Sequence, residues 1–282
     1  LLFTQGLFGE TILNFLDRLG VLPIVYTYSH DSSRTKTSKQ FLREGYPYRY
    51  INERSYNPEL IEVHPDDLII CADWTKDFFH INNLPSQSVY HIHPSLLPLY
   101  RGYGAVSEQL LRGVSIGGVS LYRDNGVIDG GDILYQSKIT IDLNDSASDY
   151  IAKCAELAAS WIAELAAGTT PEATPQDETL ATHVQRTRQK SGFIDLNMGA
   201  LYVHNTIRAY SYPYFGAFFY HNGKKINVWR SICESWAGVQ GEPGEILSKG
   251  NHGVEIACGE GSIIITHAQI DGVVYEYDEI NL

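Results

Sequence analysis

The chain has 282 residues and a formal net charge of −12, with 44% hydrophobic and 19% charged residues. This length and composition are ordinary for a soluble globular protein with one large core and a smaller one. No run of 18 apolar residues occurs and no charged segment precedes an apolar stretch, so neither a membrane-spanning helix nor a secretion signal is predicted. The acidic balance disfavours a nucleic-acid partner.

The chain starts abruptly at Leu1, inside a predicted strand, so we expect that a few N-terminal residues precede this numbering. Its cysteines are scattered and form no Cys-x-x-Cys pair; they are Cys71, Cys154, Cys233 and Cys258. This spacing favours reduced thiols, mostly in the core of a cytoplasmic protein, over a disulfide framework or a thiolate zinc site.

The first 140 residues alternate strand-like and helix-like segments, as in βαβ units on a mostly parallel sheet. Strands are predicted over residues 1–4, 22–28, 67–71, 88–91, 117–123 and 133–141. Helices are predicted over residues 10–19, 103–113 and 145–167, the last capped by Asp145 or Ser146 and ended by Gly168. The fold class is therefore α/β, with a Rossmann-like first domain over residues 1–168.

Residues 169–190 are predicted to be a linker, because residues 169–177 contain two prolines and several small polar residues. The pattern changes from residue 191 to residue 282, where a small β-rich, OB-like C-terminal domain is expected. A helix is predicted over residues 202–210, followed by short strands over 218–221, 225–230, 254–258, 262–267 and 272–277. Asn222-Gly223 is a strong hairpin signal.

Two histidines, His91 and His93, close an apolar strand and are followed at once by Pro94. Side chains at this spacing point to the same face of a strand, and proline ends the ladder because it has no N–H to donate. The pair is therefore predicted at a strand end, where open α/β sheets bind ligands. Three interpretations are open: two partly buried histidines, a His-x-His metal site that lacks a third familiar ligand, and acyl transfer.

Two glycine-containing loops have a functional and a structural interpretation. Asp129, in the stretch Ile128-Asp129-Gly130-Gly131-Asp132, is a common kind of turn aspartate, or a carboxylate that pairs with His93. Gln5-Gly6-Leu7-Phe8-Gly9 lacks a full G-x-G-x-x-G pattern, so a tight turn into the first helix is favoured over a phosphate site.

Residues 91–101 read His-Ile-His-Pro-Ser-Leu-Leu-Pro-Leu-Tyr-Arg, and Asp129 follows His93 by 36 positions. This resembles the formyltransferase family that uses N10-formyltetrahydrofolate, with its Asn-x-His-Pro-Ser-Leu-Leu-Pro motif and its later Asp-x-Gly-(Asp/Pro)-Ile motif. The resemblance extends over nearly the whole chain, through Gly192-Phe193-Ile194-Asp195 and Tyr212-Pro213-Tyr214-Phe215-Gly216. One departure stands out, because the family's catalytic Asn is His91 here.

The resemblance implies that His91, His93 and Asp129 are catalytic. His93 would be the general base for the attacking amine, Asp129 would orient it, and His91 would replace the Asn as donor to the oxyanion. No metal is implied. Residues implied to bind the folate co-substrate are Trp74, Lys76, Phe78, Asp124, Gly126, Val127 and Ile128. Trp74 and Phe78 can equally be core residues, and the implied substrate contacts are Ser95, Pro98, Arg101 and Tyr103.

Three branches of the family differ in the amine that they formylate. The purine-type enzymes have one domain, whereas this chain continues for about a hundred residues beyond the long helix. Residues 200–282 contain five Lys or Arg and nine Asp or Glu, a balance of −4 that suits a charged tRNA poorly. A nucleotide-linked deoxyamino sugar, with dTDP or UDP, is therefore the favoured substrate, and the product would serve polysaccharide biosynthesis.

Other functions stay open at this point. They are a methionyl-tRNA formyltransferase, a folate- or sugar-nucleotide-binding protein impaired by His91, and a His-x-His metal hydrolase. Exposed aromatic residues of the second domain, Tyr212, Tyr214 and Trp236, are compatible with a homodimer face or with core packing. No membrane partner is expected.

Overall fold

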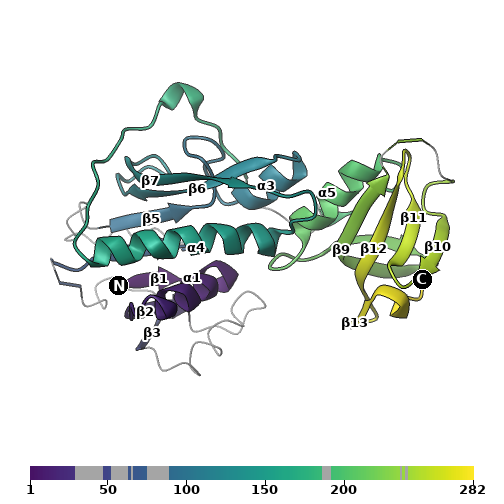
Figure 1. The fold of residues 1–282 in the computed structure, drawn as a ribbon, viewed down its shortest axis with the longest axis horizontal. Helices are drawn as coiled ribbons and strands as arrows, with labels where there is room; N and C mark the ends of the chain where they lie inside the picture. The colour runs from purple at the N-terminus through teal and green to yellow at the C-terminus, as the bar shows by residue number, and fades with distance from the viewer. Residues whose placement is uncertain are drawn as a thin grey trace. The chain divides into compact units, whose positions relative to one another are not determined.

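In the described part of the chain, seven strands form one sheet in the order β3-β2-β1-β4-β5-β6-β7 (Figure 1). These strands are β1 (Leu2–Thr4), β2 (Val25–Tyr28), β3 (Tyr48–Ile51), β4 (Ile69–Ala72), β5 (Val89–His93), β6 (Ile116–Arg123) and β7 (Ile133–Thr140). The pairings among β1 to β5 are parallel, and β6 and β7 add to β5 in antiparallel fashion. The sheet confirms the predicted Rossmann-like fold class.

The computed structural model describes residues 1–28, 47–51, 63–64, 66–74, 89–185, 192–235, 237–238 and 241–282. These residues divide into two compact units. The first unit contains Leu1–Ala105, Ile116–Thr140 and Ile151–Val184, and the second contains Val106–Ser115, Ile141–Tyr150 and Gln185–Leu282. The seven-stranded sheet lies entirely in the first unit.

Helix α1 (Gly6–Arg18) is amphipathic and buries Phe8, Ile12, Leu13 and Leu16. It begins directly after β1, at a glycine with a φ of 64°. Gly9 lies so close to β1 that an added Cβ would stand 2.0 Å from the Thr4 hydroxyl oxygen. The glycines after the first strand therefore permit a tight turn and close helix–strand packing. This agrees with the predicted tight turn into the first helix.

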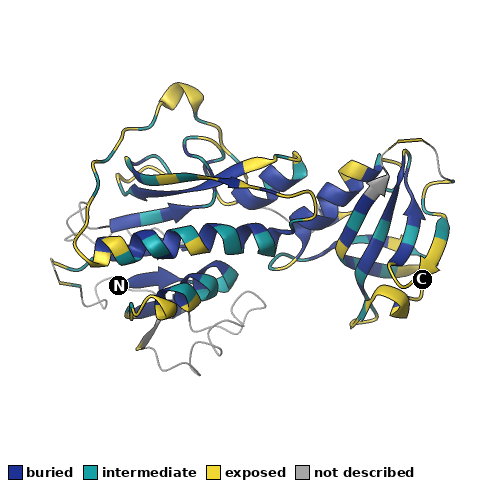
Figure 2. Ribbon diagram, in the orientation of Figure 1, coloured by how far each residue is buried: buried dark blue, intermediate teal, exposed yellow. Residues whose placement is uncertain are grey.

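Helix α4 (Ala147–Ala166) buries one face that is rich in alanine (Figure 2). Its Trp161 ring stacks on Tyr135 of β7, with 5.4 Å between ring centroids, and its Cys154 thiol donates to the Gly118 carbonyl of β6 at 3.7 Å. These contacts place the helix against β6 and β7. The small side chains permit this close approach, and the predicted helix over residues 145–167 agrees with the observed one within two residues.

Residues 169–184, predicted to be part of a linker, pack within the first unit. Thr174 exchanges two backbone hydrogen bonds of 2.8 Å with Ile133, the first residue of β7. The 3-10 turn η4 (Glu178–Leu180) follows, and Thr182 then bonds to the 98–101 turn. We call residues 174–184 the strap, because they cross from β7 to that turn.

The second unit contains helix α3 (Ala105–Leu111) from its second residue, helix α5 (Ala200–Tyr210) and an antiparallel sheet. Its strands are β8 (Ala217–His221), β9 (Lys224–Ser235), β10 (Ile246–Gly250), β11 (Gly253–Ala257), β12 (Ser262–Ile270) and β13 (Val273–Glu276), and the turn η6 (Tyr277–Glu279) follows them. Asn222 and Gly223 link β8 to β9 with φ values of 47° and 75°, as the hairpin signal predicts.

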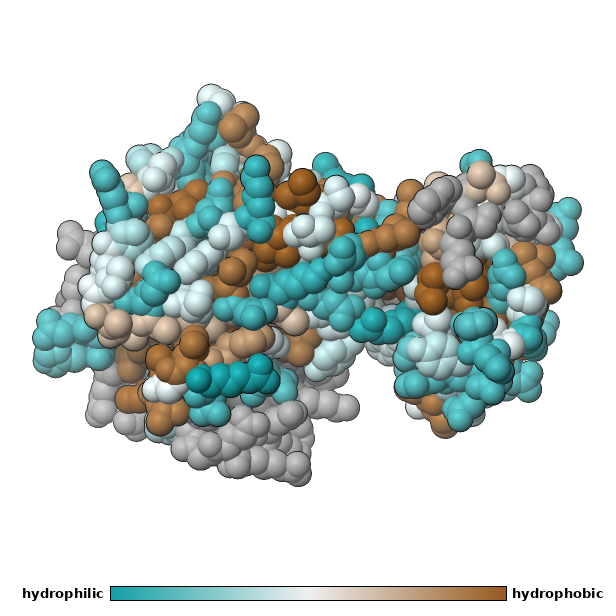
Figure 3. All heavy atoms as spheres, in the orientation of Figure 1, coloured by the Kyte–Doolittle hydropathy of each residue, from teal (hydrophilic) through white to brown (hydrophobic). Residues whose placement is uncertain are grey.

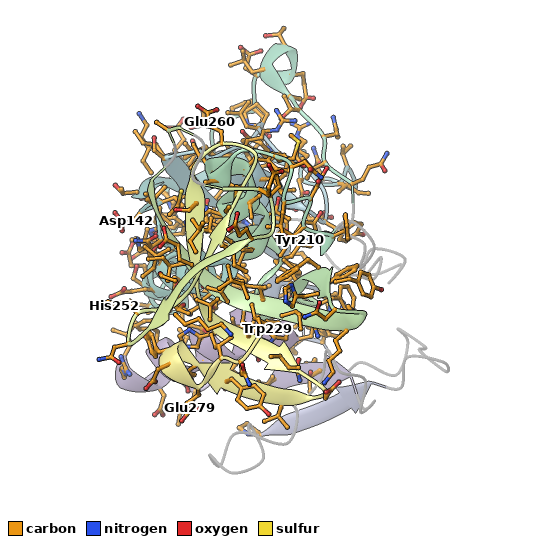
Figure 4. All side chains as sticks on the ribbon, turned by 90° about the vertical axis from the view of Figure 1, so that its right-hand side faces the viewer. Asp142, Tyr210, Trp229, His252, Glu260 and Glu279 are labelled. Carbon is orange, nitrogen blue, oxygen red and sulfur yellow. The ribbon has the colours of Figure 1, made fainter. Side chains whose placement is uncertain are left out.

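In the second unit a glycine before β8 leaves room for an aromatic side chain of β9. Tyr210 ends α5 and Trp229 lies on β9, as Figure 4 shows from the side of this unit. A Cβ on Gly216 would stand 3.1 Å from the Trp229 ring, so the glycine leaves room for the indole. Nearby, the buried His204 of α5 bonds to the Ser231 hydroxyl and the Leu143 carbonyl, both at 2.9 Å.

All four cysteines are buried free thiols, as expected. Among the described helices, none is both long and apolar enough to cross a lipid bilayer. At the surface of the second unit, exposed hydrophobic residues are interspersed with hydrophilic ones (Figure 3). Tyr212 is 52% exposed, whereas Trp236 lies outside the described residues.

The contact between Gly9 and Thr4 generates a stability prediction. In an exposed helix Gly→Ala is stabilising, but at Gly9 the added methyl group overlaps the Thr4 side chain. We expect Gly9→Ala to lower the free energy of unfolding by about 1–3 kcal/mol, measured by urea denaturation. Asn14→Ala, at an exposed position of the same helix, is the control and should be neutral or slightly stabilising. A Gly9→Ala protein as stable as the control would contradict the packing argument.

Candidate functional site

His93 is the last residue of β5 and is 6% exposed. Its Nε2 lies 2.8 Å from the Tyr100 carbonyl oxygen, and its Nδ1 lies 3.5 Å from the nearer carboxylate oxygen of Asp129. A carbonyl oxygen can only accept, so Nε2 carries the proton. In the neutral imidazole, Nδ1 therefore has a free lone pair beside a carboxylate, which suits it to accept a proton.

The Asp129 carboxylate accepts two hydrogen bonds, one from the turn after β5 and one from β6. Its Oδ2 accepts from the Gly102 backbone N–H at 2.6 Å, and its Oδ1 accepts from the Tyr122 hydroxyl at 2.7 Å. Its backbone has a φ of 53°, which is uncommon for a residue with a Cβ. The carboxylate is therefore fixed in place next to His93, and a positive charge that develops on this imidazole is stabilised there.

Tyr122 of β6 links the two histidines of β5. Its ring is stacked on His91 with 5.2 Å between ring centroids and 18° between planes, and His91 and Tyr122 are register partners in the sheet. Burial, together with the Asp129 carboxylate, raises the pKa of Tyr122 well above its usual value. The phenol therefore stays protonated and donates to Asp129 throughout the physiological range.

His91 lies on the same strand face as His93 but in a different electrostatic setting. Burial lowers its pKa to about 4, although the Asp129 carboxylate acts in the opposite direction. Its Nε2 lies 3.7 Å from Asp124, and burial raises the pKa of that carboxyl group. At neutral pH His91 is thus an uncharged imidazole, which has one N–H to donate.

The loop between β6 and β7 presents apolar side chains next to these groups. Val127 and Ile128 are 58% and 59% exposed, and Gly126 has a φ of 79°. Internal bonds hold the loop, including one from the Asn125 side-chain amide to the Gly130 carbonyl at 3.0 Å. Exposed aliphatic groups on an ordered loop suit the face of a planar ligand, and Asp124 adds a polar group at its base.

The four expected substrate contacts lie in different surroundings. Ser95 is fully buried and its hydroxyl donates to the Leu99 carbonyl at 2.6 Å. Arg101 is 2% exposed, and its guanidinium binds Gln176 and Glu178. Both side chains are therefore engaged by groups of the protein itself. Pro98 is half-buried, and Tyr103 is 51% exposed.

The expected folate contacts near β4 divide in a similar way. Trp74 belongs to a buried cluster with Phe3, Tyr26, Ile69, Cys71 and Val89, and meets the Phe3 ring edge-on at 5.6 Å. This placement fits the alternative of core packing for Trp74. Lys76 and Phe78 lie outside the described residues.

Sequence reasoning missed three elements of the site. Tyr122, the Tyr100 carbonyl and the Gly102 amide all bond to His93 or Asp129, yet none belongs to the two motifs that predicted the site. The only sequence signal for Tyr122 is its place in β6. Side chains two residues apart in a strand share a face, so Tyr122 is expected on the same face of the sheet as Ser120. Among the described residues, no group of three His, Cys, Asp or Glu side chains is arranged to hold a metal ion.

The chain matches two family models. "Formyl transferase" matches residues 27–165, and "Formyl transferase, C-terminal domain" matches residues 186–274. Among curated proteins, it is 30% identical over 224 residues to a methionyl-tRNA formyltransferase of Citrifermentans bemidjiense, covering 76% of this chain and 69% of that protein. A methionyl-tRNA formyltransferase of Lachnospira eligens is 28% identical over 78% of this chain and 69% of its own length.

Solved structures share the fold at lower identity. WlaRD, a sugar 3N-formyl transferase solved with dTDP and 5-N-formyl-THF, has a TM-score of 0.68 at 18% identity, covering 96% of this chain and 97% of that chain. The N-formyltransferase of Helicobacter canadensis, with folinic acid and dTDP-3-aminofucose, has a TM-score of 0.65 at 17% identity, covering 94% and 97%. The methionyl-tRNA formyltransferase of Clostridium thermocellum has a TM-score of 0.59 at 16% identity, covering 83% and 92%.

The lowered pKa of His91 predicts an acid-dependent loss of stability. Between about pH 6.5 and pH 4 the unfolded chain protonates this histidine and the folded chain does not. The unfolded state then binds more protons, so the free energy of unfolding falls as the pH falls, by up to about 1.4 kcal/mol per pH unit for one such group.

We expect the wild type to lose more stability between pH 7 and pH 5 than His91→Asn does, in urea denaturation at both pH values. His204, whose pKa burial also lowers to about 4, contributes equally to both proteins. The control is His252→Asn, which removes one exposed imidazole. Equal losses for the wild type and His91→Asn would show that His91 is protonated in the folded state.

Proposed function

We propose that this chain, which belongs to the formyl transferase family, transfers a formyl group from N10-formyltetrahydrofolate to the amine of a nucleotide-linked deoxyamino sugar. The single observation that carries the proposal is the placement of His93 at the end of β5, with Nε2 on the Tyr100 carbonyl and Nδ1 3.5 Å from Asp129. An amine that attacks a formyl carbon must lose a proton, and Nδ1 is placed to accept one.

In the proposed reaction the amine nitrogen forms a bond to the formyl carbon, and His93 Nδ1 takes the proton that the amine loses. Asp129 stabilises the resulting imidazolium, while the Tyr100 carbonyl holds the ring through Nε2. The bond between the formyl carbon and N10 of the folate then breaks. The imidazolium returns its proton to N10, which leaves a formamide and tetrahydrofolate.

His91 is proposed as the donor to the oxyanion of the tetrahedral intermediate, in place of the family's Asn. As a neutral imidazole it keeps one N–H at working pH, and the stacked Tyr122 ring limits its rotation. A preorganised donor of this kind contributes about 2.7–4 kcal/mol to transition-state stability in other enzymes. A flat imidazole holds its N–H further from the backbone than an Asn amide, so the reacting carbon would sit correspondingly further from β5.

The folate is proposed to lie against the loop between β6 and β7. Val127, Ile128 and Gly126 would contact its faces, and Asp124 its polar ring edge. Lys76 and Phe78 remain proposed contacts from the sequence alone. The structural neighbours named with 5-N-formyl-THF and with folinic acid support a folate in this fold.

Two observations support a nucleotide-linked amino sugar as the substrate: the share of this chain that sugar formyltransferase structures match, and the negative charge of residues 200–282. WlaRD and the Helicobacter canadensis enzyme, named with dTDP and dTDP-3-aminofucose, match this chain over at least 94% of its length. The balance of −4 over residues 200–282 disfavours the polyanionic backbone of tRNA. Tyr103 and Pro98 remain proposed substrate contacts, whereas Arg101 is already engaged by Gln176 and Glu178. We propose a cytoplasmic enzyme whose product enters surface polysaccharide.

A second candidate amine is the methionyl group of initiator tRNA, which the curated relatives at 28–30% identity favour. The two functions share every step at His93 and differ only in the substrate. They are separated by binding, because a tRNA enzyme shifts charged initiator tRNA in a gel at low salt.

The proposed function predicts a mass gain of one formyl group on an amino sugar. Purified protein is incubated with N10-formyltetrahydrofolate and a panel of dTDP-, UDP- and GDP-linked amino sugars, and the products are analysed by mass spectrometry. We expect one member to gain the group only when the folate is present, and His93→Ala to abolish the gain. Formylation of methionyl-tRNA, with none of the sugars modified, would replace the proposal by the second candidate.

The role of His91 separates a working enzyme from an impaired binding protein. If His91 is the native oxyanion donor, His91→Asn leaves kcat unchanged or lowers it. A large gain of activity in His91→Asn would instead identify the natural chain as an impaired member of the family. Folate binding, measured by isothermal titration, is the control that both proteins are folded and occupied.

Tyr122→Phe should lower kcat by about tenfold, since a hydrogen bond to a charged group contributes about 1.5–3 kcal/mol, part of which water replaces. The variant keeps the ring stacked on His91 and removes only the donor to Asp129. Tyr135→Phe is a matched control, because the Tyr135 hydroxyl also donates to a carboxylate, that of Glu164, at 2.8 Å. This bond contains no residue of the site. Equal activities of the two variants would show that Asp129 does not depend on Tyr122.

A further inference from the structure

The strap, residues 174–184, contacts both sides of the proposed catalytic pair. At its start Thr174 extends β7 by pairing with Ile133, which follows the Asp129 loop. At its end Thr182 accepts from the Arg101 N–H at 2.8 Å, and its hydroxyl accepts from the Tyr100 N–H at 2.8 Å. The residue whose carbonyl binds His93 and the loop that carries Asp129 are thus joined through one segment.

Gln176 makes the most direct connection within the strap. Its Nε2 donates to the Asp129 carbonyl at 2.9 Å and to the Gly131 carbonyl at 2.7 Å. Its Oε1 accepts from Arg101, from Nη2 at 2.7 Å and from Nε at 3.3 Å. Both N–H groups and both lone pairs of the side-chain amide are therefore used, so its orientation is determined.

Arg101 is a rigid anchor for this amide. The guanidinium is almost fully buried and also binds the Glu178 carboxylate through two bonds of 2.7 and 2.8 Å. A buried fork with four hydrogen bonds does not reorient without leaving a charge unpaired. The neighbours of Arg101 in the chain are Tyr100, whose carbonyl binds His93, and Gly102, whose N–H binds Asp129.

We propose that Gln176 is a positioning residue that sets the distance between Asp129 and His93. The proposal rests on the proposed function. The side-chain amide holds the backbone of Asp129 in its left-handed conformation and ties it to the turn that carries Tyr100 and Gly102. Gln176 touches no reacting atom in this scheme; it acts through Asp129.

The sharpest variant is Gln176→Glu, which keeps the shape and the acceptor for Arg101. It removes both N–H donors and places a carboxylate against two carbonyl oxygens, which repels the Asp129 loop. We expect kcat to fall about tenfold or more, while KM for both substrates stays within about twofold. Gln269→Glu is the matched control, because Gln269 also donates to a carbonyl, that of Gly272, in the second unit.

A double-mutant cycle distinguishes positioning from a general structural role. If Gln176 acts through Asp129, then Gln176→Glu lowers single-turnover rates in the wild type but by less than about twofold in an Asp129→Asn background. An equal loss in both backgrounds would overturn the proposal, as would an unchanged kcat in Gln176→Glu. Gln176→Ala, which adds no charge, gives the same comparison if the Glu variant fails to fold.

Hydrogen exchange tests the connection without any assay of activity. In Gln176→Ala, the peptides that cover residues 98–104 and 123–133 should exchange faster than in the wild type, and in Gln269→Ala they should not. Unchanged exchange would overturn the proposal even in an active enzyme. If the wild type formylates no amine, the proposed function fails, and the exchange result still decides whether Gln176 holds the Asp129 loop.

Discussion

The hydrogen bonds to the Asp129 carboxylate are the constraint on which the site depends. A carboxylate 3.5 Å from His93 Nδ1 stabilises a proton there only while its own orientation is held. Tyr122 and the Gly102 amide supply that hold from two separate parts of the first unit, β6 and the turn after β5. The fold therefore contributes to the chemistry mainly by bringing these two donors to one carboxylate.

Two glycines make this convergence sterically feasible. A Cβ on Gly102, whose φ is 106°, would stand 2.4 Å from the Val184 carbonyl of the strap, and a Cβ on Gly131 would stand 1.6 Å from the Arg123 carbonyl. The backbone of Val184 therefore passes close to Gly102, and the backbone of Arg123 passes close to Gly131. The strap can thus run beside the 98–101 turn, and the Asp129 loop can return to β7, only because these residues have no side chain.

Most of the fold could be predicted from the sequence, because apolar periodicity reports burial. The central strands β1, β4, β5 and β6 and the long helix α4 were expected close to their observed bounds. Two edge strands, β3 and β10, were not predicted. For β10 the reason is that an edge strand has a partner on one side only, so its side chains follow solvent as much as core. In β10 the last three residues are exposed, which erases the alternation.

The candidate site likewise contains residues that could be predicted from the sequence and residues that could not. His93 and Asp129 could be predicted because their side chains carry the chemistry and recur in a motif. The residues that hold them could not, because a backbone carbonyl, a backbone amide and a Gln in a proline-containing stretch have no compositional signature. Arg101 shows the converse limit: an Arg after such a motif suggests a ligand contact, and its bonds to Gln176 and Glu178 of the strap could not be predicted from the sequence.

The histidine in place of the family's Asn is accommodated by the same Tyr122 that holds Asp129. An imidazole is larger than a carboxamide, and at this position it lies flat against the phenol ring of its register partner. One residue therefore restrains the proposed oxyanion donor through its ring and the partner of the proposed base through its hydroxyl. Because both contacts depend on the pairing of β5 with β6, a shift in that register would misplace His91, His93 and Asp129 together.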